Sequence, residues 1–590
     1  MKPTDYDIVI IGAGLAGLTL SYQLLRETDK TVLLLDRRAD VPGPKQKVGE
    51  SLVQVGGYYF GKTLDLEEYL FREHYMKYNL RFYWKTPGKE NDRFEDYSQS
   101  YIRTFSNIPC YQLDRNTLET ELLRRCRADE RLSFEAPATQ LRVDLSETEA
   151  HTVAYRRGDI EVTATATWVV DTSGRSKVLA RKMDLAQDNA VDHGASFLWV
   201  DGLVDIDKLT DLSPKALRLK RDRSSTGHLP VWLATNHFMG EGLWFWVIPL
   251  QGKTSLGLVY DNAAVSRDRV STPEALLDWV CETFPLFEKE LRGRKVLDHG
   301  SFKSFSYGCA LTINKARWAM SGESGRFADP LYSPGSDFIA LHNTLIIDAI
   351  VSDEEDLEAK CGLHELLMRS IYESLLPTYA ASYDALGDQE AFTLKYTWEL
   401  SVYFGFFVFP FINDLIVDRR FLASFYRHFS ALGPINSGLQ KFISDYYQWK
   451  KAHGRLPKDP VFHDFTRVGA LRTAEKAFYS VGVTVEEARE VLARQTDNLL
   501  ELARYIVAHV TSVVLGKKEA LRNRAFVESI DLGNLVFDPE QMAQGYGAYE
   551  TSPGHYEWAF DPDALNGFHE AEEPLDDVAS AAEIAKSIAG

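Results

Sequence analysis

Two tryptophans and one lysine are the residues of this sequence whose surroundings suggest chemistry. Trp244 and Trp246 stand two positions apart in the apolar run WFWVIP, residues 244–249. Side chains at positions i and i+2 of an extended strand point to the same face, so the two rings would form an aromatic wall. Lys77 lies in an aromatic-rich run, residues 74–84, where burial would lower the pKa of its amine. The plainer alternatives are a pair of core aromatics and a solvated surface lysine.

The N-terminal residues carry a nucleotide-binding pattern. Residues 6–11 form an apolar, β-branched run that predicts a strand. This run leads into a GxGxxG sequence whose glycines are Gly12, Gly14 and Gly17. Such glycines permit a tight turn, close approach of the backbone to a pyrophosphate, and close strand–helix packing. A second apolar run ends at Asp36, whose carboxylate can accept hydrogen bonds from ribose hydroxyls. The unit predicts binding of an adenosine diphosphate group without a 2′-phosphate, and it leaves FAD and NAD both open.

Three later segments resemble the FAD-contacting segments of class A flavin monooxygenases and halogenases. They are QLDR at residues 112–115, VVDTSGRS at residues 169–176 and SGESGRFADP at residues 321–330. The resemblance implies that the dinucleotide is FAD, and that Arg115 and Asp329 bind it. Glu323 departs from the family pattern, which has aspartate there, and its carboxylate is one methylene further from the backbone.

Two more motifs are similar to those of the flavin-dependent halogenases. WFWVIP matches the WxWxIP signature of that family, and GES at residues 49–51 resembles its segment along the flavin ring. The second likeness implies that Glu50 and Ser51 bind the cofactor. Lys77 falls on the catalytic lysine of the family. The resemblance implies that this amine hydrogen-bonds hypochlorous acid or forms a chloramine, while the two tryptophans prevent direct monooxygenation at the flavin.

The turn that follows Asp329 departs from the halogenase pattern. The resemblance implies that backbone N–H groups around Ser333 and Gly335 hold a halide beside the flavin, with Gly335 also at the cofactor. Pro334 has no N–H, so one expected donor is missing. A hydrogen bond to a charged group contributes about 1.5–3 kcal/mol, so its loss predicts halide binding weakened by about 10- to 100-fold. Asp337 either adds a negative charge there or, as the pattern favours, caps the helix that follows.

The composition is typical of a large globular enzyme. The chain has 590 residues, of which 45% are hydrophobic and 12% aromatic, and this suffices for a sizeable core. A net charge of −19 argues against nucleic acid or an anionic membrane surface as a partner. Five scattered cysteines without CxxC spacing, and no signal peptide, predict reduced thiols in the cytoplasm. The longest apolar stretch, residues 402–417, is shorter than the roughly 20 residues of a membrane span, so we expect a buried helix or a tunnel lining.

The elements that would position these residues alternate between strands and helices up to about residue 350. We expect an α/β core, residues 1–353, with a Rossmann-like FAD-binding fold. Its substrate-side sheet is predicted from the β-rich residues 134–170 and 197–260. Residues 354–560 are expected to form a helical C-terminal domain, and residues 561–590 an acidic, solvated tail. Within the helical domain, apolar periodicity predicts helices at residues 363–382, 421–447, 474–495 and 499–514.

Together these features favour an FAD-dependent halogenase of secondary metabolism, such as antibiotic biosynthesis. The resemblance implies that it uses reduced FAD from a separate reductase, O2 and a halide on an electron-rich aromatic substrate, free or tethered to a carrier protein. A halogenase-like monooxygenase, dehydrogenase or reductase that uses no halide stays open, and Pro334 favours it. A third alternative is a flavin-bearing binding or electron-transfer module whose helical region, which resembles that of phenol- and carrier-type halogenases, docks a carrier protein. No zinc, Walker or serine-hydrolase motif is present in the sequence.

Overall fold

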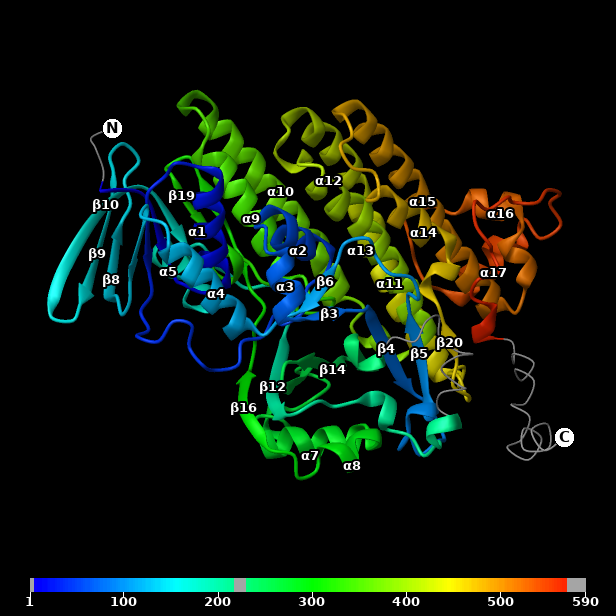
Figure 1. The fold of residues 1–590 in the computed structure, drawn as a ribbon. Coiled ribbons are helices and arrows are strands. Elements are labelled where there is room, and N and C mark those ends of the chain that lie inside the picture. The colour runs from blue at the N-terminus through cyan, green and yellow to red at the C-terminus, as the bar shows by residue number, and fades with distance from the viewer. Residues whose placement is uncertain (1–4, 217–229, 570–590) are drawn as a thin grey trace.

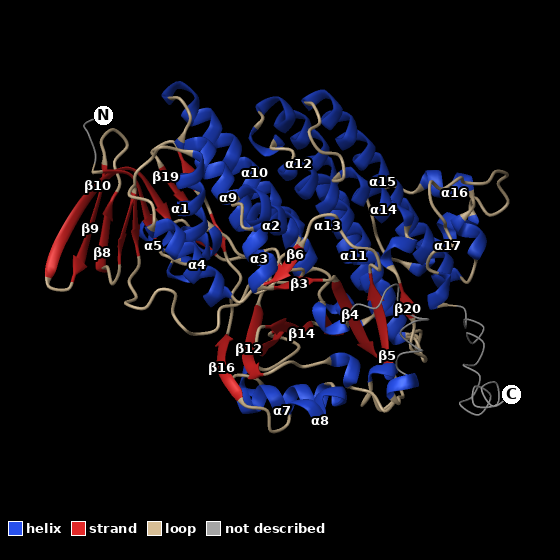
Figure 2. Cartoon of the chain, viewed as in Figure 1, coloured by secondary structure: helices blue, strands red, loops and turns tan. Residues whose placement is uncertain are grey.

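Two β-sheets and a large block of helices make up the protein. The computed structural model describes residues 5–216 and 230–569. The blue and cyan strands near the N-terminus form one sheet, the strands β12, β14 and β4 belong to a second, and helices cover both along one side (Figure 1). Figure 2 shows this division, with one group of red strands at the left and the other below the row of blue helices.

The first sheet has a parallel centre that presents the glycine-rich turn. Its strand order is β18-β19-β10-β1-β2-β7. The bounds of these strands are β1 (Tyr6–Ile11), β2 (Val32–Leu35), β7 (Leu132–Glu135), β10 (Ile160–Asp171), β18 (Ile313–Asn314) and β19 (Trp318–Met320). Strands β10, β1, β2 and β7 run parallel, and their apolar runs are buried because helices such as α1 (Leu15–Glu27) and α4 (Arg115–Arg127) pack nearby. This arrangement confirms the predicted Rossmann-like fold.

The prediction that residues 134–170 belong to the substrate-side sheet is wrong. The strands β8 (Thr139–Asp144), β9 (His151–Arg157) and β10 all join the first sheet. β10 is long enough to pair with two strands. Its first half pairs antiparallel with β9, and its second half pairs parallel with β1. A β-rich composition does not show which other strand a strand will pair with. This pairing determines the sheet to which the strand belongs.

The second sheet carries the tryptophan motif on a central strand. Its order is β16-β12-β15-β14-β13-β4-β5-β20. The bounds are β4 (Leu80–Lys85), β5 (Tyr97–Tyr101), β12 (His193–Asp201), β13 (Thr235–Gly240), β14 (Leu243–Leu250), β15 (Lys253–Asp261), β16 (Val296–Phe302) and β20 (Phe462–His463). The described part of residues 197–260 therefore lies in the predicted sheet. Helices α7 (Pro273–Thr283) and α8 (Glu288–Leu291) pack on the face that carries Phe245, so the two tryptophans occupy the opposite face.

Long helices follow the second sheet. They include α9 (Gly335–Ile350), α10 (Glu354–Ala380), α11 (Gln389–Tyr403), α13 (Arg419–Ala452), α14 (Gly469–Ala477) and α15 (Val485–Leu515). The predicted helices at residues 363–382 and 421–447 lie within α10 and α13. The prediction at residues 474–495 is wrong, because the chain leaves the helix after α14, passes Gly482 at φ 72°, and restarts at the capping box of Thr484 and Glu487. α15 then continues through the predicted helix at residues 499–514.

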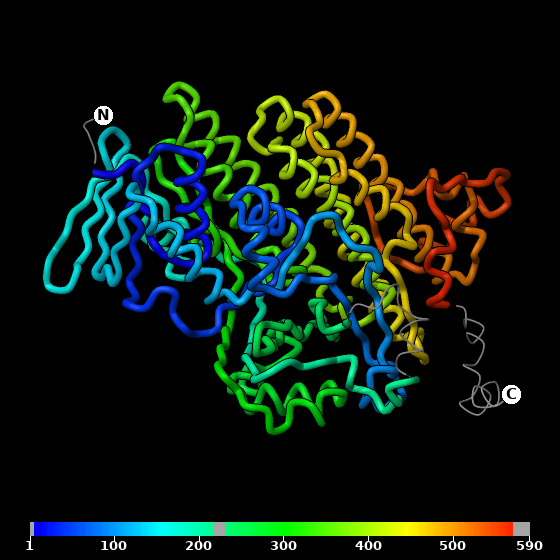
Figure 3. Tube along the Cα trace, in the orientation of Figure 1, coloured from blue at the N-terminus to red at the C-terminus, as the bar shows by residue number. Residues whose placement is uncertain are grey.

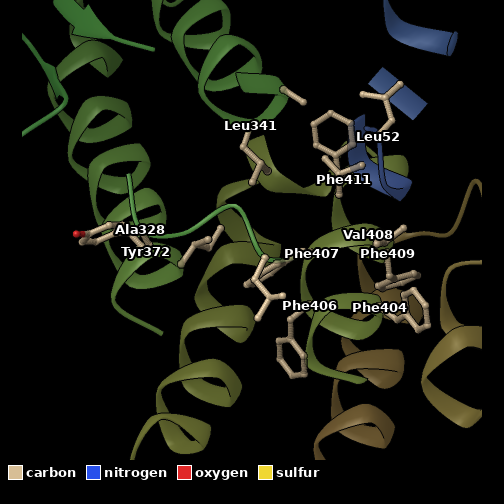
Figure 4. Close-up of a cluster of buried hydrophobic side chains, with 14 of the residues drawn as sticks. Leu52, Ala328, Leu341, Tyr372, Phe404, Phe406, Phe407, Val408, Phe409 and Phe411 are labelled. Atoms are coloured by element: carbon tan, nitrogen blue, oxygen red, sulfur yellow. The ribbon is translucent and has the colours of Figure 1, made fainter. Parts of the chain in front are cut away.

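The apolar stretch at residues 402–417 is buried helical structure, as expected. It comprises the end of α11, a π-helical turn at Phe404–Val408 and α12 (Phe409–Ile412). Figure 4 shows aromatic side chains of this stretch beside Leu52 from the N-terminal part and Leu341 from α9. These residues belong to one continuous hydrophobic core, so the helical region and the N-terminal part stabilise one another.

Only α15 among the described helices has the length and apolar composition of a membrane span, and 67% of its most apolar window is buried in the protein. A buried window of this kind is typical of a core helix. The tube in Figure 3 places the N-terminal strands and the red C-terminal helices at opposite ends of the molecule. Residues 570–590, most of the predicted acidic tail, lie outside the described residues.

Candidate functional site

A cavity of about 800 Å³ lies at the carboxyl edge of the first sheet, where the glycine turn meets the second sheet. We call it the nucleotide cavity. Gly12 has φ +112°, and a Cβ atom there would lie 2.6 Å from the Thr172 carbonyl oxygen. A Cβ on Gly17 would lie 2.0 Å from the Gly12 carbonyl oxygen, whereas one on Gly14 would meet no protein atom within 4 Å. Gly12 and Gly17 therefore serve the turn and its packing, and Gly14 faces open space at the start of α1.

Asp36 lines the same cavity at the end of β2. Its carboxylate accepts hydrogen bonds from the Ala13 backbone N–H at 2.9 Å and from the Arg38 guanidinium at 2.8 and 2.9 Å. Burial opposes ionisation, but the hydrogen bonds from Arg38 and Ala13 outweigh it and lower the pKa of Asp36. The carboxylate is thus charged and fixed where a ribose would lie.

Arg115 and Glu323 also line the nucleotide cavity. The Arg115 guanidinium donates to the Val48 carbonyl oxygen at 2.8 Å and pairs with Glu119 at 2.7 Å. Glu323 is half-buried, and desolvation raises the pKa of its carboxyl group although Arg175 and Arg115 oppose this. Two segments far apart in the sequence thus supply charged groups to one cavity.

The two tryptophans form the expected wall of this cavity. Their ring centroids lie 5.6 Å apart, and both side chains are buried. The Trp246 indole N–H donates to the Ser255 hydroxyl at 3.1 Å, and Ser255 in turn donates to Glu50 at 2.5 Å. The Trp244 indole N–H donates to the Tyr383 hydroxyl at 2.7 Å. Each ring is thus fixed by a hydrogen bond at its polar edge.

Glu50 connects this wall to the GES segment. Besides Ser255, its carboxylate accepts a hydrogen bond from the Trp199 indole N–H at 2.7 Å. Burial raises the pKa of Glu50 to about 7, against the opposing effect of these donors. The neighbouring Ser51 hydroxyl lies 2.9 Å from the Thr235 hydroxyl and also accepts from Lys77. Glu50 and Ser51 therefore line the nucleotide cavity.

Lys77 lies in a second cavity, of about 630 Å³, which we call the substrate cavity. The side chain ends β3 (Tyr75–Lys77), is only 6% exposed, and donates to the Ser51 hydroxyl at 2.9 Å and the Leu52 carbonyl oxygen at 2.7 Å. The surface-lysine interpretation is therefore wrong. Burial lowers the pKa of Lys77 to about 8, so a large fraction of the amine is neutral near that pH. Ser51 lines one cavity and Leu52 the other, which places Lys77 at the wall between them.

The turn after Asp329 is another part of that wall. Ser333 and Gly335 line the nucleotide cavity, and Tyr332 and Pro334 line the substrate cavity. Tyr332 and Ser333 have φ 68° and 64°, so the backbone is left-handed at both. The Ser333 N–H donates to the Pro330 carbonyl oxygen at 2.9 Å. Ser333 therefore uses its N–H within the turn, whereas Gly335 begins α9, where the first N–H groups have no partner inside the helix.

Asp329 and Asp337 both have buried partners that are distant in the sequence. The Asp329 carboxylate lies 2.7 Å from the His193 imidazole and accepts a hydrogen bond from the Tyr383 hydroxyl at 3.2 Å, and its cofactor-binding role stays a prediction. These contacts hold Asp329, and with it the turn that follows, in place. The prediction that Asp337 caps α9 is wrong, because its carboxylate accepts from the Gly56 N–H and the Tyr403 hydroxyl, both at 2.7 Å. Burial raises the pKa of Asp337 to about 7.

Sequence reasoning missed the residues that hold the wall in place. Tyr383 fixes both Trp244 and Asp329, and it stacks on His193 with ring centroids 3.9 Å apart. Tyr383 comes from the helical region, 139 residues from Trp244 and 54 residues from Asp329 in the sequence. No local pattern marks such a residue, because its role depends only on how the sheet and the helices pack.

A second buried polar group lies away from both cavities. The Nε2 atoms of His509 and His569 lie 2.7 and 2.6 Å from one Glu390 oxygen, and the Lys450 ammonium donates to the other oxygen at 2.7 Å. Burial opposes ionisation of Glu390, but Lys450 and the histidines hold its pKa well below the usual range. With that ammonium in place, the group is explained as an ion-pair network that joins α11, α13 and α15 to the segment near residue 569. It lends no support to a metal ion.

Known proteins with similar sequences are flavin-dependent halogenases. Residues 10–70 match the NAD(P)-binding Rossmann-like domain family. The flavin-dependent halogenase chlA of Dictyostelium discoideum is 25% identical over 359 residues, which cover 57% of this chain and 58% of that protein. Tetracycline 7-halogenase of Kitasatospora aureofaciens is 25% identical over 391 residues, which cover 61% of this chain and 67% of that protein. The matched part is thus less than two thirds of the length of chlA.

Solved structures show the same relationship at the level of the fold. The halogenase PltM, in an L111Y variant bound to FAD, superposes with a TM-score of 0.58 and 15% identity, covering 84% of this chain and 96% of that one. The halogenase CmlS gives a TM-score of 0.50 and 18% identity, over 77% of this chain and 78% of that one. In sequence and in fold, the chain is therefore similar to the flavin-dependent halogenases, and it is built around a Rossmann-like FAD-binding domain.

Proposed function

We propose that this protein is an FAD-dependent halogenase that acts on an electron-rich aromatic substrate. The observation that carries the proposal is Lys77, a buried amine at the wall between two cavities. An amine so placed can receive a small oxidant from one compartment and act on a substrate in the other. The names of the relatives, a tetracycline 7-halogenase and a brominase of a carrier-bound pyrrole, support an aromatic substrate, either free or tethered to a carrier protein.

The nucleotide cavity suits FAD. Gly14 leaves room for a pyrophosphate at the N-terminus of α1, where unpaired N–H groups and the helix dipole favour an anion. Asp36 would hold the ribose, and Arg115, Glu50 and Ser51 would line the remainder of the cofactor. Reduced FAD supplied by a separate reductase would, with O2, provide the oxidising equivalents that convert a halide ion into hypohalous acid.

The residues of the chain would divide this chemistry between two compartments. Trp244 and Trp246 line the nucleotide cavity and would keep an aromatic substrate away from the flavin. The substrate would instead lie in the substrate cavity with Lys77. The neutral amine of Lys77 would accept a hydrogen bond from hypohalous acid and hold it close to the ring, so that the oxidant does not diffuse away.

A halogenase-like oxidoreductase that uses no halide is the second candidate. Pro334 supplies no N–H, and the Ser333 N–H already donates to the Pro330 carbonyl oxygen, so both positions lack a free donor for a halide. Gly335 and the following residues at the start of α9 keep their N–H groups available. This helix start favours halide binding at Gly335 and keeps halogenation the first candidate.

The test is turnover of a phenolic probe, phloroglucinol, by the FAD-loaded protein with a flavin reductase, NADH and O2. Reactions contain chloride, bromide or neither halide, and products are identified by mass spectrometry. We expect a mono-halogenated product only when halide is present. An oxygenated product that forms equally well without halide would support the second candidate instead.

Substituting Pro334 tests the missing donor directly. Pro334→Ser restores a backbone N–H beside Gly335, and we expect the half-saturating halide concentration to fall by about 10-fold or more. Freeing the dihedral angle that proline fixes costs only about 0.4–1 kcal/mol, less than a charged hydrogen bond contributes. Product formation against chloride and bromide concentration measures the effect. An unchanged halide response, with robust activity in both proteins, would mean that other donors hold the halide.

A cytoplasmic location completes the proposal. All five cysteines are buried and free of disulfides in the described structure, which suits a reducing compartment. The same compartment would hold the reductase that supplies reduced FAD.

A further inference from the structure

The substrate cavity has one polar site within a largely apolar and aromatic lining. Glu399 and Tyr332 both line this cavity. One carboxylate oxygen of Glu399, Oε2, and the Tyr332 hydroxyl are buried, and neither has a hydrogen-bond partner among the described residues. The two groups face each other closely enough that burial, followed by the Glu399 charge and a long hydrogen-bond contact with that carboxylate, raises the pKa of Tyr332 well above its usual value. Buried polar atoms without partners are rare, and in a cavity they indicate where a ligand can bind.

The other oxygen of Glu399 is firmly held. Oε1 accepts from the Lys395 ammonium at 2.7 Å and from the Gln440 side-chain amide at 2.9 Å. Lys395 is fully buried and donates also to the Thr378 carbonyl oxygen and the Ser382 hydroxyl, both at 2.8 Å. These contacts fix the carboxylate and compensate its charge, while Oε2 stays available toward the cavity. Such a carboxylate is a preorganised hydrogen-bond acceptor.

Glu399 lies on the same helix face as Tyr403, which contacts the rest of the site. Glu399 and Tyr403 are four residues apart on α11, so they share one face of the helix. The Tyr403 hydroxyl donates to Asp337, whose charge in turn acts on Lys77. Tyr332 belongs to the turn that separates the two cavities. A ring bound at Glu399 and Tyr332 would therefore lie between the turn and the lysine face of the cavity.

The charges of the lining limit the ligand. Lys77 is the one lysine or arginine among the described residues that line the substrate cavity, whereas four acidic residues line it. A carboxylated or phosphorylated compound would find little to balance its charge there. A neutral hydroxyl group, by contrast, can donate to Oε2 of Glu399 and accept from Tyr332.

We propose that Glu399 is a catalytic residue that binds the hydroxyl group of the substrate through Oε2, beside the Tyr332 hydroxyl. The proposal rests on the proposed function for the identity of the reaction, and on the cavity alone for the binding site. A phenol that donates to a carboxylate gains electron density in its ring, which favours attack by an electrophilic halogen at the ortho and para positions. Glu399 would thus both position the ring and make it more reactive.

The experiment compares two probes that differ only in the donor. 5-Pentylresorcinol carries two hydroxyl groups, and 5-pentyl-1,3-dimethoxybenzene has the same carbon skeleton without a donor. Binding of each to the FAD-loaded protein is measured by isothermal titration calorimetry, without reductant or halide. We expect the native protein to bind the resorcinol about 10- to 100-fold more tightly, since the hydrogen bond is to a charged group. Equal affinities would overturn the proposal.

Glu399→Gln should remove most of that preference. The dissociation constant of the resorcinol is expected to rise by about 10- to 100-fold, while that of the dimethyl ether stays within about 3-fold. The matched control is Glu373→Gln, which removes a carboxylate from an exposed residue lining the same cavity and should leave both constants unchanged. A preference that survives in Glu399→Gln would overturn the proposal, because a group other than the Glu399 carboxylate would then bind the hydroxyl.

A second variant guards against misfolding. Because Glu399→Gln disturbs the buried pair with Lys395, Tyr332→Phe is measured as well, since it leaves that pair intact. Removing this neutral hydrogen bond should weaken resorcinol binding by about 2- to 10-fold and leave the ether unaffected. The readout also separates the two proposals. Tight, Glu399-dependent binding without any halogenated product would contradict the proposed function, and halogenation with an unchanged KM in Glu399→Gln would contradict this inference.

Discussion

Lys77→Ala is expected to reduce halogenated product by at least about 100-fold, while FAD binding and the oxidation of reduced FAD by O2 are unchanged. The reason is the division of the site into two cavities. Lys77 lines the substrate cavity and reaches the nucleotide cavity only through its hydrogen bond to Ser51. The lysine would act after the cofactor has done its part, so its removal stops product formation and spares the earlier steps.

The measurement follows three quantities in parallel. FAD content is measured by absorbance, O2 consumption with reduced FAD by an electrode, and product by mass spectrometry. Lys77→Met is the companion variant, because it keeps most of the side-chain volume and removes only the amine. Lys62→Ala is the matched control, since Lys62 lies on the same part of the chain with 56% of its side chain exposed. Unchanged product in both Lys77 variants would remove the amine from the mechanism.

The pKa of Lys77 adds an expected pH dependence to this prediction. Burial lowers it to about 8, so the fraction of neutral amine rises as the pH increases through that value. If the neutral amine acts, product formation in the native protein should rise over the same interval. The residual rate of Lys77→Met should lack this rise, which separates a chemical role from a purely structural one.

Local patterns in the sequence were enough to predict the glycine turn and the tryptophan wall. The GxGxxG run and the i, i+2 spacing of Trp244 and Trp246 each depend on the geometry of one or two neighbouring elements. The position of Lys77 could be predicted only from the resemblance to halogenases, because nothing in its immediate neighbours distinguishes a buried lysine from a solvated one. In the structure, β3 pairs with residues 110–112, and Gln112 also bridges to Ser51 of the GES segment. This pairing places Lys77 in the interior.

The failures share a physical cause, which is contact between segments that are distant in the sequence. Asp337 has the pattern of a helix cap, yet its carboxylate bonds to Gly56 and Tyr403 because the helical region brings them within reach. The contacts of Asp329 with His193 and Tyr383 are likewise invisible in the sequence around it. Buried carboxylates take the partners that tertiary packing provides, and a pattern of nearby residues does not contain that information.

Gly14→Val is expected to leave the protein folded and to abolish FAD binding. A Cβ atom on Gly14 would meet no protein atom within 4 Å, and the backbone of Gly14 is extended at φ −88° and ψ −170°, which valine tolerates. The new methyl groups would instead fill the space at the start of α1 where a pyrophosphate would approach the backbone N–H groups. Losing two charged hydrogen bonds there should weaken FAD binding by about 100-fold or more.

Gly17→Val provides the contrast that makes the Gly14 result specific. A Cβ atom on Gly17 would lie 2.0 Å from the Gly12 carbonyl oxygen and 2.6 Å from the Thr172 hydroxyl, so this variant should unfold or express poorly. Gly14→Val should instead keep the melting temperature of the FAD-free native protein and show no flavin absorbance after dialysis against FAD. Full flavin content in Gly14→Val would mean that the open space at this glycine belongs to something other than the pyrophosphate. Because Gly17→Val fails through a clash within the protein and Gly14 meets no protein atom, a loss of flavin without a loss of stability in Gly14→Val points to the space that the cofactor occupies.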